Sequence, residues 1–170
     1  MSQDAHLEVI RETTGTLSRT AVEHWLTGGW AVDFLYGGVS RTHKDIDLVI
    51  RADDATRATA ALCAAGFEQR ESAYPEERLE FTRNGVDVEL IFLTSDAGGR
   101  LATPGRWIQW PWPSDTLSGP VGQIGDVSCR VVSVAAQIDS KRNYISHGTG
   151  EPREQDLHDL KLLDAFAERN

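Results

Sequence analysis

The stretch from Thr27 to Leu48, with the sequence TGGWAVDFLYGGVSRTHKDIDL, decides the fold of this chain. It begins with a glycine pair after an apolar run and continues through a short segment with helical apolar spacing. It ends with a basic cluster and two aspartates two residues apart. In a β-strand alternate side chains share one face, so Asp45 and Asp47 would project together while the residues between and after them contact the core.

Two carboxylates held side by side favour a divalent cation. Two like charges about 4 Å apart repel by roughly 4 kcal/mol at an effective dielectric of about 20, so a fold keeps such a pair only where something offsets the repulsion. Mg²⁺ is the natural agent, because it is usually held by one or two carboxylates plus substrate phosphates. The alternative is an exposed pair at a strand edge. The preceding Gly28-Gly29 and the basic residues Arg41, His43 and Lys44 favour the metal site.

Length and composition indicate one compact unit. The chain of 170 residues is short for two independent domains, so we expect a core of residues 1–132 with a helical segment of residues 133–170 packed on it. A formal net charge of −9 argues against a duplex nucleic-acid binder. No signal peptide is evident, and no apolar run approaches the ~20 residues that cross a bilayer. We therefore expect a cytoplasmic monomer or homodimer with no membrane partner, in which Cys63 and Cys129 are buried free thiols.

Apolar spacing predicts helices and strands along most of the chain. Helices are expected at residues 5–18, 30–36, 55–65, 134–145 and 154–169, and strands at residues 22–26, 45–50, 67–70, 78–82, 86–93 and 126–132. Asn84-Gly85 is the dipeptide most typical of a type I′ hairpin turn. Gly148 and Gly150 are expected to end the fourth helix, and Pro152 to precede the fifth. That closing helix is expected to turn a stripe of residues inward, namely Leu157, Leu160, Leu162 or Leu163, and Phe166.

The strand expected at residues 86–93 supplies further acids, because Asp87 and Glu89 would share one of its faces. If this strand lies beside the Asp45 strand, up to four carboxylates converge on one patch. Surface alternation explains the two acids equally well in isolation. Their occurrence together with Asp45 and Asp47 favours a functional site.

The glycine pair Gly28-Gly29 lets the backbone turn sharply and exposes amide groups where a helix begins. A helix N-terminus with free amides is a ready phosphate site. Further along, residues 98–125 look irregular and carry Trp107, Trp110 and Trp112. A long irregular stretch is usually either a functional loop or poorly ordered, and tryptophans favour the first. Three roles are open for them: walling a pocket for a rigid organic substrate, forming a dimer contact, or covering the core.

Taken together, these pieces resemble the nucleotidyltransferase superfamily that includes DNA polymerase beta. Within it, they look most like lincosamide nucleotidyltransferases and aminoglycoside 2″-nucleotidyltransferases. The matching segments are residues 25–33, 41–48, 86–89 and 154–163. The resemblance implies an α/β (α+β) nucleotidyltransferase fold, in which helices flank a small mixed β-sheet and C-terminal helices close the cleft.

Carried over by position, the glycine motif of the family falls on Gly28 and Gly29, and its paired metal aspartates fall on Asp45 and Asp47. The third aspartate of the family falls on Asp87. The resemblance implies that this third acid is a metal ligand, a general base, or both.

Glu89, two residues further on, is a rival for the base. The place of Arg41, His43 and Lys44 in the motif implies that they lie near the triphosphate of the nucleotide.

The implied activity is Mg²⁺-dependent transfer of a nucleoside monophosphate, most simply AMP from ATP, to a hydroxyl of an aminoglycoside or a lincosamide, with release of pyrophosphate. The implied partners are ATP or another nucleoside triphosphate and the small acceptor, which Trp107, Trp110 and Trp112 and the final helices would recognise. The surplus of acid tilts the choice toward a cationic acceptor. Two alternatives are a toxin–antitoxin type enzyme that adds AMP to a protein, and a relative that binds nucleotide or ligand without turnover.

Overall fold

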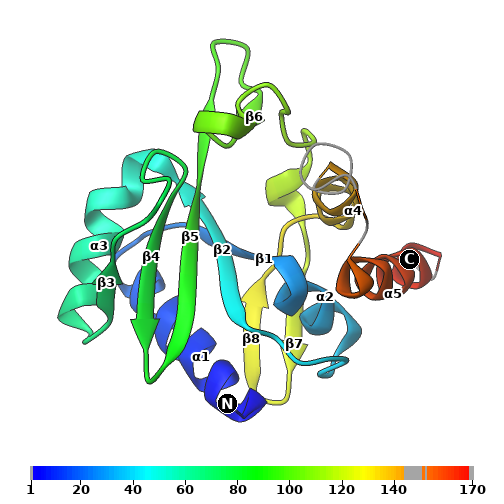
Figure 1. The fold of residues 1–170 in the computed structure, drawn as a ribbon, viewed down its shortest axis with the longest axis horizontal. Helices are drawn as coiled ribbons and strands as arrows, with labels where there is room; N and C mark the ends of the chain where they lie inside the picture. The colour runs from blue at the N-terminus through cyan, green and yellow to red at the C-terminus, as the bar shows by residue number, and fades with distance from the viewer. Residues whose placement is uncertain (1, 144–150, 152, 169–170) are drawn as a thin grey trace.

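The computed structural model describes residues 2–143, 151 and 153–168, which form a mixed β-sheet with helices packed around it (Figure 1). The helices and strands, in chain order, are α1 (Gln3–Arg19), β1 (His24–Thr27), α2 (Gly28–Tyr36), β2 (Asp45–Arg51), α3 (Ala55–Ala64), β3 (Glu68–Arg70), β4 (Arg78–Arg83), β5 (Val86–Ser95), β6 (Leu101–Ala102), β7 (Val121–Ile124), β8 (Val127–Arg130), α4 (Val134–Asn143) and α5 (Glu154–Ala167). Within the described part of the chain, no helix combines the length and the apolar character needed to span a bilayer.

The main sheet has the strand order β1-β2-β5-β4-β3, and the short β6 pairs with the far end of β5. Strands β2 and β5 run parallel, whereas the other pairs in this sheet are antiparallel. The connection from β2 to β5 passes through α3, β3 and β4, which gives the chain length that a parallel pair requires. In this parallel register Asp45 lies opposite Asp87 and Asp47 lies opposite Glu89. The central pairing therefore brings both acidic segments to one edge of the sheet.

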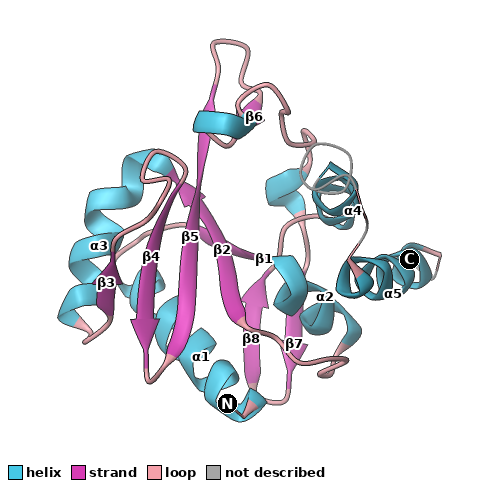
Figure 2. Cartoon of the chain, in the orientation of Figure 1, coloured by secondary structure: helices cyan, strands magenta, loops and turns pink. Residues whose placement is uncertain are grey.

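The two faces of the sheet are covered differently, as Figure 2 shows for the helices. Ile46 and Leu48 of β2 and Val88 of β5 point to the face covered by α1 and α3, where they form the larger hydrophobic core. On the other face, Val49 packs in a smaller cluster with Ala136 of α4. This second cluster covers only one end of its face. The carboxylates at the starts of β2 and β5 lie at the uncovered end.

Most of the expected elements are confirmed to within a few residues. Both residues of the hairpin turn have positive φ angles, 52° at Asn84 and 77° at Gly85, as a type I′ turn requires. The expected end of α4 and the breaks at Gly148 and Gly150 lie outside the described residues, as does Pro152.

Three of the sequence expectations are wrong. Within the stretch expected to be irregular, Val121–Ile124 forms β7, which pairs with β8 in a separate hairpin. Buried and exposed residues alternate along β7, but the sequence hides this because the buried position 122 is a glycine. A side chain at this position would meet the backbone of Phe34 at 2.8 Å. Cys63 is exposed on α3, although both cysteines are free as expected.

The closing helix α5 also departs from its expected orientation. Leu163 is buried, but Leu157 is 45% exposed. The inward face instead carries Asp156 and Asp159, which are 1% and 0% exposed. Carboxylates can be buried in this way because cations pair with them: Asp159 pairs with Arg41 and with Lys141 of α4, and Asp156 pairs with Arg153, the N-cap of α5 itself. A hydrophobicity pattern alone cannot anticipate such pairing.

Candidate active site

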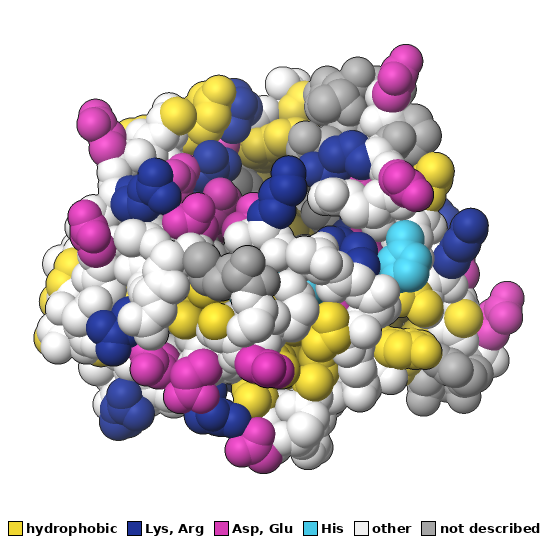
Figure 3. Space-filling view, turned by 60° about the horizontal axis from the view of Figure 1, so that its bottom comes forward, with side chains coloured by type: hydrophobic (Ala, Val, Ile, Leu, Met, Phe, Trp, Pro, Cys, Tyr) yellow, Lys and Arg dark blue, Asp and Glu magenta, His cyan; other side chains and the backbone are white. Residues whose placement is uncertain are grey.

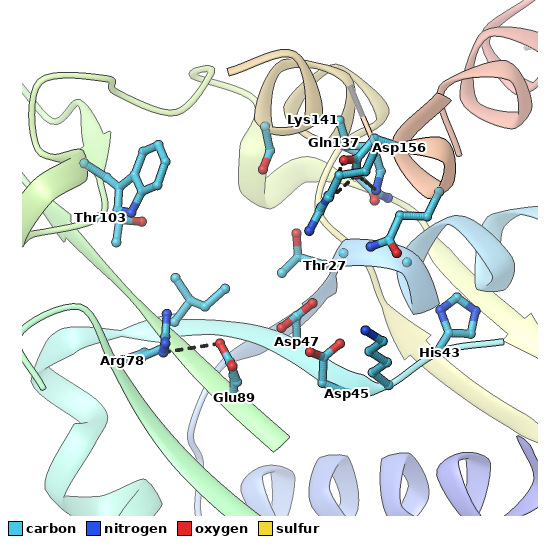
Figure 4. A pocket seen from close by; sticks show the side chains of 18 of the residues that line it. Thr27, His43, Asp45, Asp47, Arg78, Glu89, Thr103, Gln137, Lys141 and Asp156 are labelled. Atoms are coloured by element: carbon cyan, nitrogen blue, oxygen red, sulfur yellow. Dashed lines mark hydrogen bonds and ion pairs between the residues drawn. The ribbon is translucent and has the colours of Figure 1, made fainter. Parts of the chain in front are cut away.

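A cavity of about 760 Å³ lies over the uncovered end of the sheet. Its walls come from the glycine pair at the start of α2, from β2 and β5, from the tryptophan-rich segment before β7, and from α4 and α5. Figure 3 shows acidic and basic side chains gathered around a hollow on this face. Figure 4 shows that carboxylates lie on the floor of the cavity and that α4 and α5 lie on the opposite wall.

Asp45, Asp47 and Glu89 lie on the floor of this cavity, and two further carboxylates, Glu77 and Asp156, line other parts of it. Burial raises the pKa of Asp47 to about 8, and the charges of Asp45 and Glu89 add to the effect, while Lys141 and Arg78 oppose it. A carboxylate with so high a pKa lies where a positive charge is favoured. This site therefore has the electrostatic character of a cation site.

Glu89 lies across the parallel pair from Asp47. Burial is the main cause that raises the pKa of Glu89, and Asp45 also raises it, whereas the guanidinium of Arg78 lowers it. The Nε atom of Arg78 is 3.3 Å from Oε2 of Glu89. Glu89 thus combines access to the cavity with a pKa above that of an ordinary glutamate, which suits a general base.

Asp87 is not among the described residues that line the cavity. It lies two positions before Glu89 on β5, about 7 Å back along the strand. Its Oδ1 atom accepts a hydrogen bond of 2.9 Å from Arg70 on β3, and about half of each side chain is exposed. The structure therefore brings Asp45, Asp47 and Glu89 together and leaves Asp87 with a partner of its own.

The glycine pair approaches the carboxylates closely. Gly28 has a φ of +66°, and a Cβ atom there would lie 2.3 Å from Oδ2 of Asp47. Only glycine satisfies both constraints. Thr27, the N-cap of α2, makes no side-chain capping hydrogen bond, and the first amides of a helix have no intrahelical acceptor. The first amides of α2 therefore lie beside the carboxylates without a side-chain cap from Thr27.

His43 lines the cavity, and its contacts with Asp33 and Trp30 fix the position of its ring. Its Nε2 atom is 2.6 Å from Oδ2 of the fully buried Asp33, and its ring stacks on Trp30 at 4.4 Å between centroids. Asp33 also accepts hydrogen bonds from the backbone and the hydroxyl of Ser40. The Nδ1 atom of His43 lies on the side of Gly29, 2.6 Å from where a Cβ atom would be. His43 therefore presents one ring nitrogen toward the glycine pair.

Arg41 and Lys141 also line the cavity, but both are engaged with Asp159 of α5. Arg41 donates from Nε and Nη2 at 2.8 and 2.7 Å, and Lys141 donates from Nζ at 2.7 Å. Burial alone would raise the pKa of Asp159, but these two cations outweigh it and lower the pKa. Arg153 makes a similar pair with Asp156. Lys44, which the sequence also proposes as a basic residue of the site, lines the cavity and is exposed.

Asp156 and Asp159 were not identified as site residues from the sequence. The available signal was their three-residue spacing in a segment expected to be an amphipathic helix. That spacing places two acids on one helical face. The long-range partner Arg41, 118 positions away in the chain, could not be inferred from such local spacing.

Trp107, Trp110 and Trp112 all line the cavity. The rings of Trp107 and Trp110 lie 5.8 Å apart at 59°, and Nε1 of Trp112 donates to the hydroxyl of Thr103 at 3.0 Å. Trp112 also packs against the smaller hydrophobic cluster. The tryptophan-rich segment is thus an ordered wall.

A second long-range contact fixes this segment. The side chain of Glu77, which is 3% exposed, accepts hydrogen bonds from the backbone N, Nε and Nη2 of Arg106 at 2.8, 2.9 and 2.8 Å. Gly105 has a φ of +72°, and a Cβ atom there would lie 2.7 Å from Glu77. We call this contact between Glu77 and Arg106 the loop tether. Its consequence is that the position of Trp107 depends on a residue outside the segment.

The carboxylates fit Mg²⁺ only together with a substrate. Among the described residues, no three histidine, cysteine, aspartate or glutamate side chains are grouped so as to hold a metal ion by themselves. Mg²⁺ commonly takes one or two carboxylates and completes its shell with water and substrate phosphates. Asp45 and Asp47, beside the uncapped start of α2 at Gly28-Gly29, fit that type of site.

A mixed sheet with two carboxylates at the start of one strand, beside a glycine turn that opens a helix, defines the nucleotidyltransferase fold. Solved structures of this fold resemble the chain. One, of the antibiotic-resistance factor ANT(2″)-Ia, has a TM-score of 0.78 at 16% identity and covers 96% of this chain and 85% of its own. The lincosamide antibiotic adenylyltransferase LnuA, bound to lincomycin, has a TM-score of 0.65 at 22% identity and covers 88% of this chain and 90% of its own. At these identities the likeness concerns the fold.

The sequence comparisons are more specific. The sequence model of the aminoglycoside-2″-adenylyltransferase family matches residues 9–163. A lincosamide resistance protein of Staphylococcus haemolyticus is 32% identical over 150 residues, which are 85% of this chain and 86% of that protein. The chain belongs to the aminoglycoside-2″-adenylyltransferase family and is an enzyme of the nucleotidyltransferase class.

Proposed function

We propose that this enzyme transfers AMP from ATP to a hydroxyl group of an antibiotic, either an aminoglycoside or a lincosamide, and releases pyrophosphate. The observation that carries the proposal is the convergence of Asp45, Asp47 and Glu89 beside the glycine turn at Gly28-Gly29, on the floor of one cavity. The family and the lincosamide resistance relative supply the two acceptor classes.

In this proposal the donor nucleotide occupies the side of the cavity formed by the start of α2. The free amides at Gly28 and Gly29 bind phosphate oxygens, and Lys44 adds a positive charge at the same side. His43, oriented by Asp33, offers Nδ1 toward the same phosphates. Asp45 and Asp47 would hold Mg²⁺, which supplies charge neutralisation at the phosphate oxygens when it is bound.

Glu89 is the proposed general base. It removes the proton of the acceptor hydroxyl while that oxygen forms a bond to the α-phosphorus and the bond from this phosphorus to the pyrophosphate oxygen breaks. Burial, the main cause, raises its pKa above that of an ordinary glutamate, which makes its carboxylate a stronger proton acceptor. Asp87 remains the alternative from the sequence, but its carboxylate is paired with Arg70 and lies off the cavity.

The proposed acceptor site lies between Glu89 and the wall formed by Trp107, Trp110 and Trp112. Aromatic faces suit both the apolar surface of a sugar ring and a nearby cationic group. Rigid walls also lower the entropic cost of holding the hydroxyl in line with the phosphorus.

The proposal is tested by incubating the protein with Mg²⁺, each of the four nucleoside triphosphates and a panel of aminoglycosides and lincosamides, followed by mass spectrometry. The expected product is an antibiotic heavier by one AMP unit, formed from ATP. Asp47→Asn should lower the rate at least about 10³-fold, because it removes a charge on which the cation depends.

The matched control is Asp126→Asn, which changes an aspartate that is 86% exposed on the turn between β7 and β8. It should leave the rate within about twofold of the wild type. Absence of any product across the panel, or an Asp47→Asn rate equal to that of the control, would contradict the proposal.

A further inference from the structure

Gln137 of α4 has a carboxamide without a hydrogen-bond partner in the described part of the chain. The residue is 1% exposed, and neither its Nε2 nor its Oε1 atom has a hydrogen-bond partner among the described residues. Its side chain nevertheless lines the active-site cavity. The other unpartnered buried atoms in the described chain, Nε1 of Trp30 and Oε1 of Gln3, do not line it.

Such a group is costly to keep. A buried polar atom without a partner destabilises the fold, and native structures contain few of them. A methionine has nearly the same shape and would remove the penalty. The neighbouring cation cannot relieve it, because Lys141 points its ammonium group to Asp159 at 2.7 Å. The amide of Gln137 is therefore suited to a partner that enters the cavity.

The position of Gln137 indicates which ligand this is. In phosphoryl-group transfer the attacking and leaving oxygens lie roughly in line through the phosphorus. The proposed function places the leaving pyrophosphate at Gly28-Gly29 and the attacking hydroxyl at Glu89. The nucleoside must leave the phosphorus in a third direction. Figure 4 shows Gln137 on the wall above Asp47, across the cavity from Glu89.

The chemistry of the amide narrows the ligand further. A carboxamide offers an N–H donor and a carbonyl acceptor side by side. Adenine presents the complementary pair, a 6-amino donor beside a ring-nitrogen acceptor, and glutamine makes this bidentate contact in protein–DNA recognition. We propose that Gln137 binds the adenine of the nucleotide donor through its 6-amino group and the adjacent ring nitrogen, and so sets the preference for ATP. This inference rests on the proposed function and deepens it.

The test combines a substitution in the protein with a deletion in the ligand. Kd is measured in Mg²⁺ for ATP and for purine riboside triphosphate, which lacks the 6-amino group. The wild type should bind ATP about tenfold more tightly, which is the ratio expected from 1.4 kcal/mol. In Gln137→Met the ratio should fall to about twofold or less, because the two changes remove the same contact.

The matched control is Gln155→Met, which changes an exposed glutamine of α5 that lines the same cavity. It should keep the tenfold ratio. A thermal melt without nucleotide provides the check on folding. Gln137→Met should melt at or above the wild-type temperature, because it removes two unpaired buried atoms. A lower melting temperature would show that the amide has a partner inside the protein and would overturn the inference.

The remaining outcomes separate this inference from the proposed function. Equal wild-type affinity for the two nucleotides overturns the inference, while a product of AMP transfer in the mass assay would still support the function. If Gln137→Met keeps the wild-type ratio of the two Kd values but has a raised KM for the antibiotic, Gln137 contacts the acceptor. That result also overturns the inference. Failure of the wild type to bind either nucleotide overturns both.

Discussion

The carboxylate half of the cavity and its tryptophan half are held by different kinds of contact. The carboxylate half comprises the glycine pair, the β2 aspartates and Glu89, and backbone pairing fixes it. Thr27 lies opposite Asp47 in the β1–β2 ladder, and Asp47 lies opposite Glu89 in the β2–β5 ladder. Once the register forms, the positions of these groups follow from the alternation of side chains along a strand.

The tryptophan half comprises Trp107, Trp110 and Trp112. A backbone hydrogen bond of 2.8 Å from Trp112 to Leu101 connects it to β6, and side-chain contacts supplement this bond. The loop tether joins it to the start of β4, and a hydrogen bond from Trp112 to Thr103 joins two of its own parts. A backbone ladder resists single substitutions, whereas a side-chain tether is lost with one residue. The comparison therefore predicts that substitutions in the carboxylate half lower kcat. Substitutions in the tryptophan half should change the binding of the acceptor alone.

The largest expected effect in the carboxylate half separates Glu89 from Asp87. Glu89→Gln should lower kcat about 10² to 10⁴-fold with little change in the Kd for Mg²⁺-ATP, because it removes a proton acceptor. Asp87→Asn should lower kcat less than about tenfold, since its carboxylate is paired with Arg70 outside the cavity. Steady-state kinetics with a reactive antibiotic measure both. The reverse order would make Asp87 the base.

A smaller effect is expected when the glycine turn is disturbed. Gly28→Ala combines positive-φ strain with a close contact to Asp47 and should lower kcat about 100-fold, which is what a displacement of 1 Å can cost in a catalytic group. Gly37→Ala has the same kind of strain, at φ +88°, with nothing within 4 Å of the new Cβ. It should lower the free energy of unfolding by about 1–2 kcal/mol and leave kcat unchanged. Equal kcat values in the two variants would show that the close approach is irrelevant.

In the tryptophan half, Glu77→Gln should raise KM for the antibiotic about tenfold while KM for ATP stays the same. The amide keeps the size of Glu77 but loses the charge that holds Arg106 with three hydrogen bonds. Asp96→Asn is the control, because Asp96 makes an exposed pair with Arg100 just before the same segment. It should change neither KM. A rise in KM for ATP in Glu77→Gln would mean that the two halves are not independent.

The same difference explains how much the sequence could reveal. The placement of Asp45, Asp47 and Glu89 on one patch could be predicted because alternation along a strand is a local pattern, and the turn at Gly28-Gly29 because a glycine pair before a helical segment is local as well. The fold class followed from the same patterns and from resemblance. The burial of Asp159 could not be predicted, since it depends on Arg41, a cation from a distant part of the chain. The loop tether was missed for the same reason, because 29 positions separate Glu77 from Arg106.

The smallest expected effect concerns pH in the metal-free protein. The pKa of Asp47 is about 8 in the folded chain, well above the ordinary value of 3.8, so between these two values the folded state binds a proton that the unfolded state has lost. The contribution of Asp47 to stability is therefore progressively lost as pH rises from about 4 to about 8. Mg²⁺ competes with that proton, and its stabilising effect should grow over the same range.

Asp45→Asn tests the part of this pKa shift that comes from the neighbouring aspartate, beside the larger part that comes from burial. It removes a charge that raises the pKa of Asp47, and so it should flatten the fall in melting temperature between pH 5 and pH 8 in EDTA. Melting curves of the wild type and Asp45→Asn, with EDTA or with Mg²⁺, measure the effect. If the two proteins have parallel pH profiles in EDTA, Asp45 does not raise the pKa of Asp47, and repulsion between the two aspartates is not what favours a cation. If only the wild type loses stability toward pH 8 and Mg²⁺ restores it, repulsion between the two aspartates links folding to metal binding.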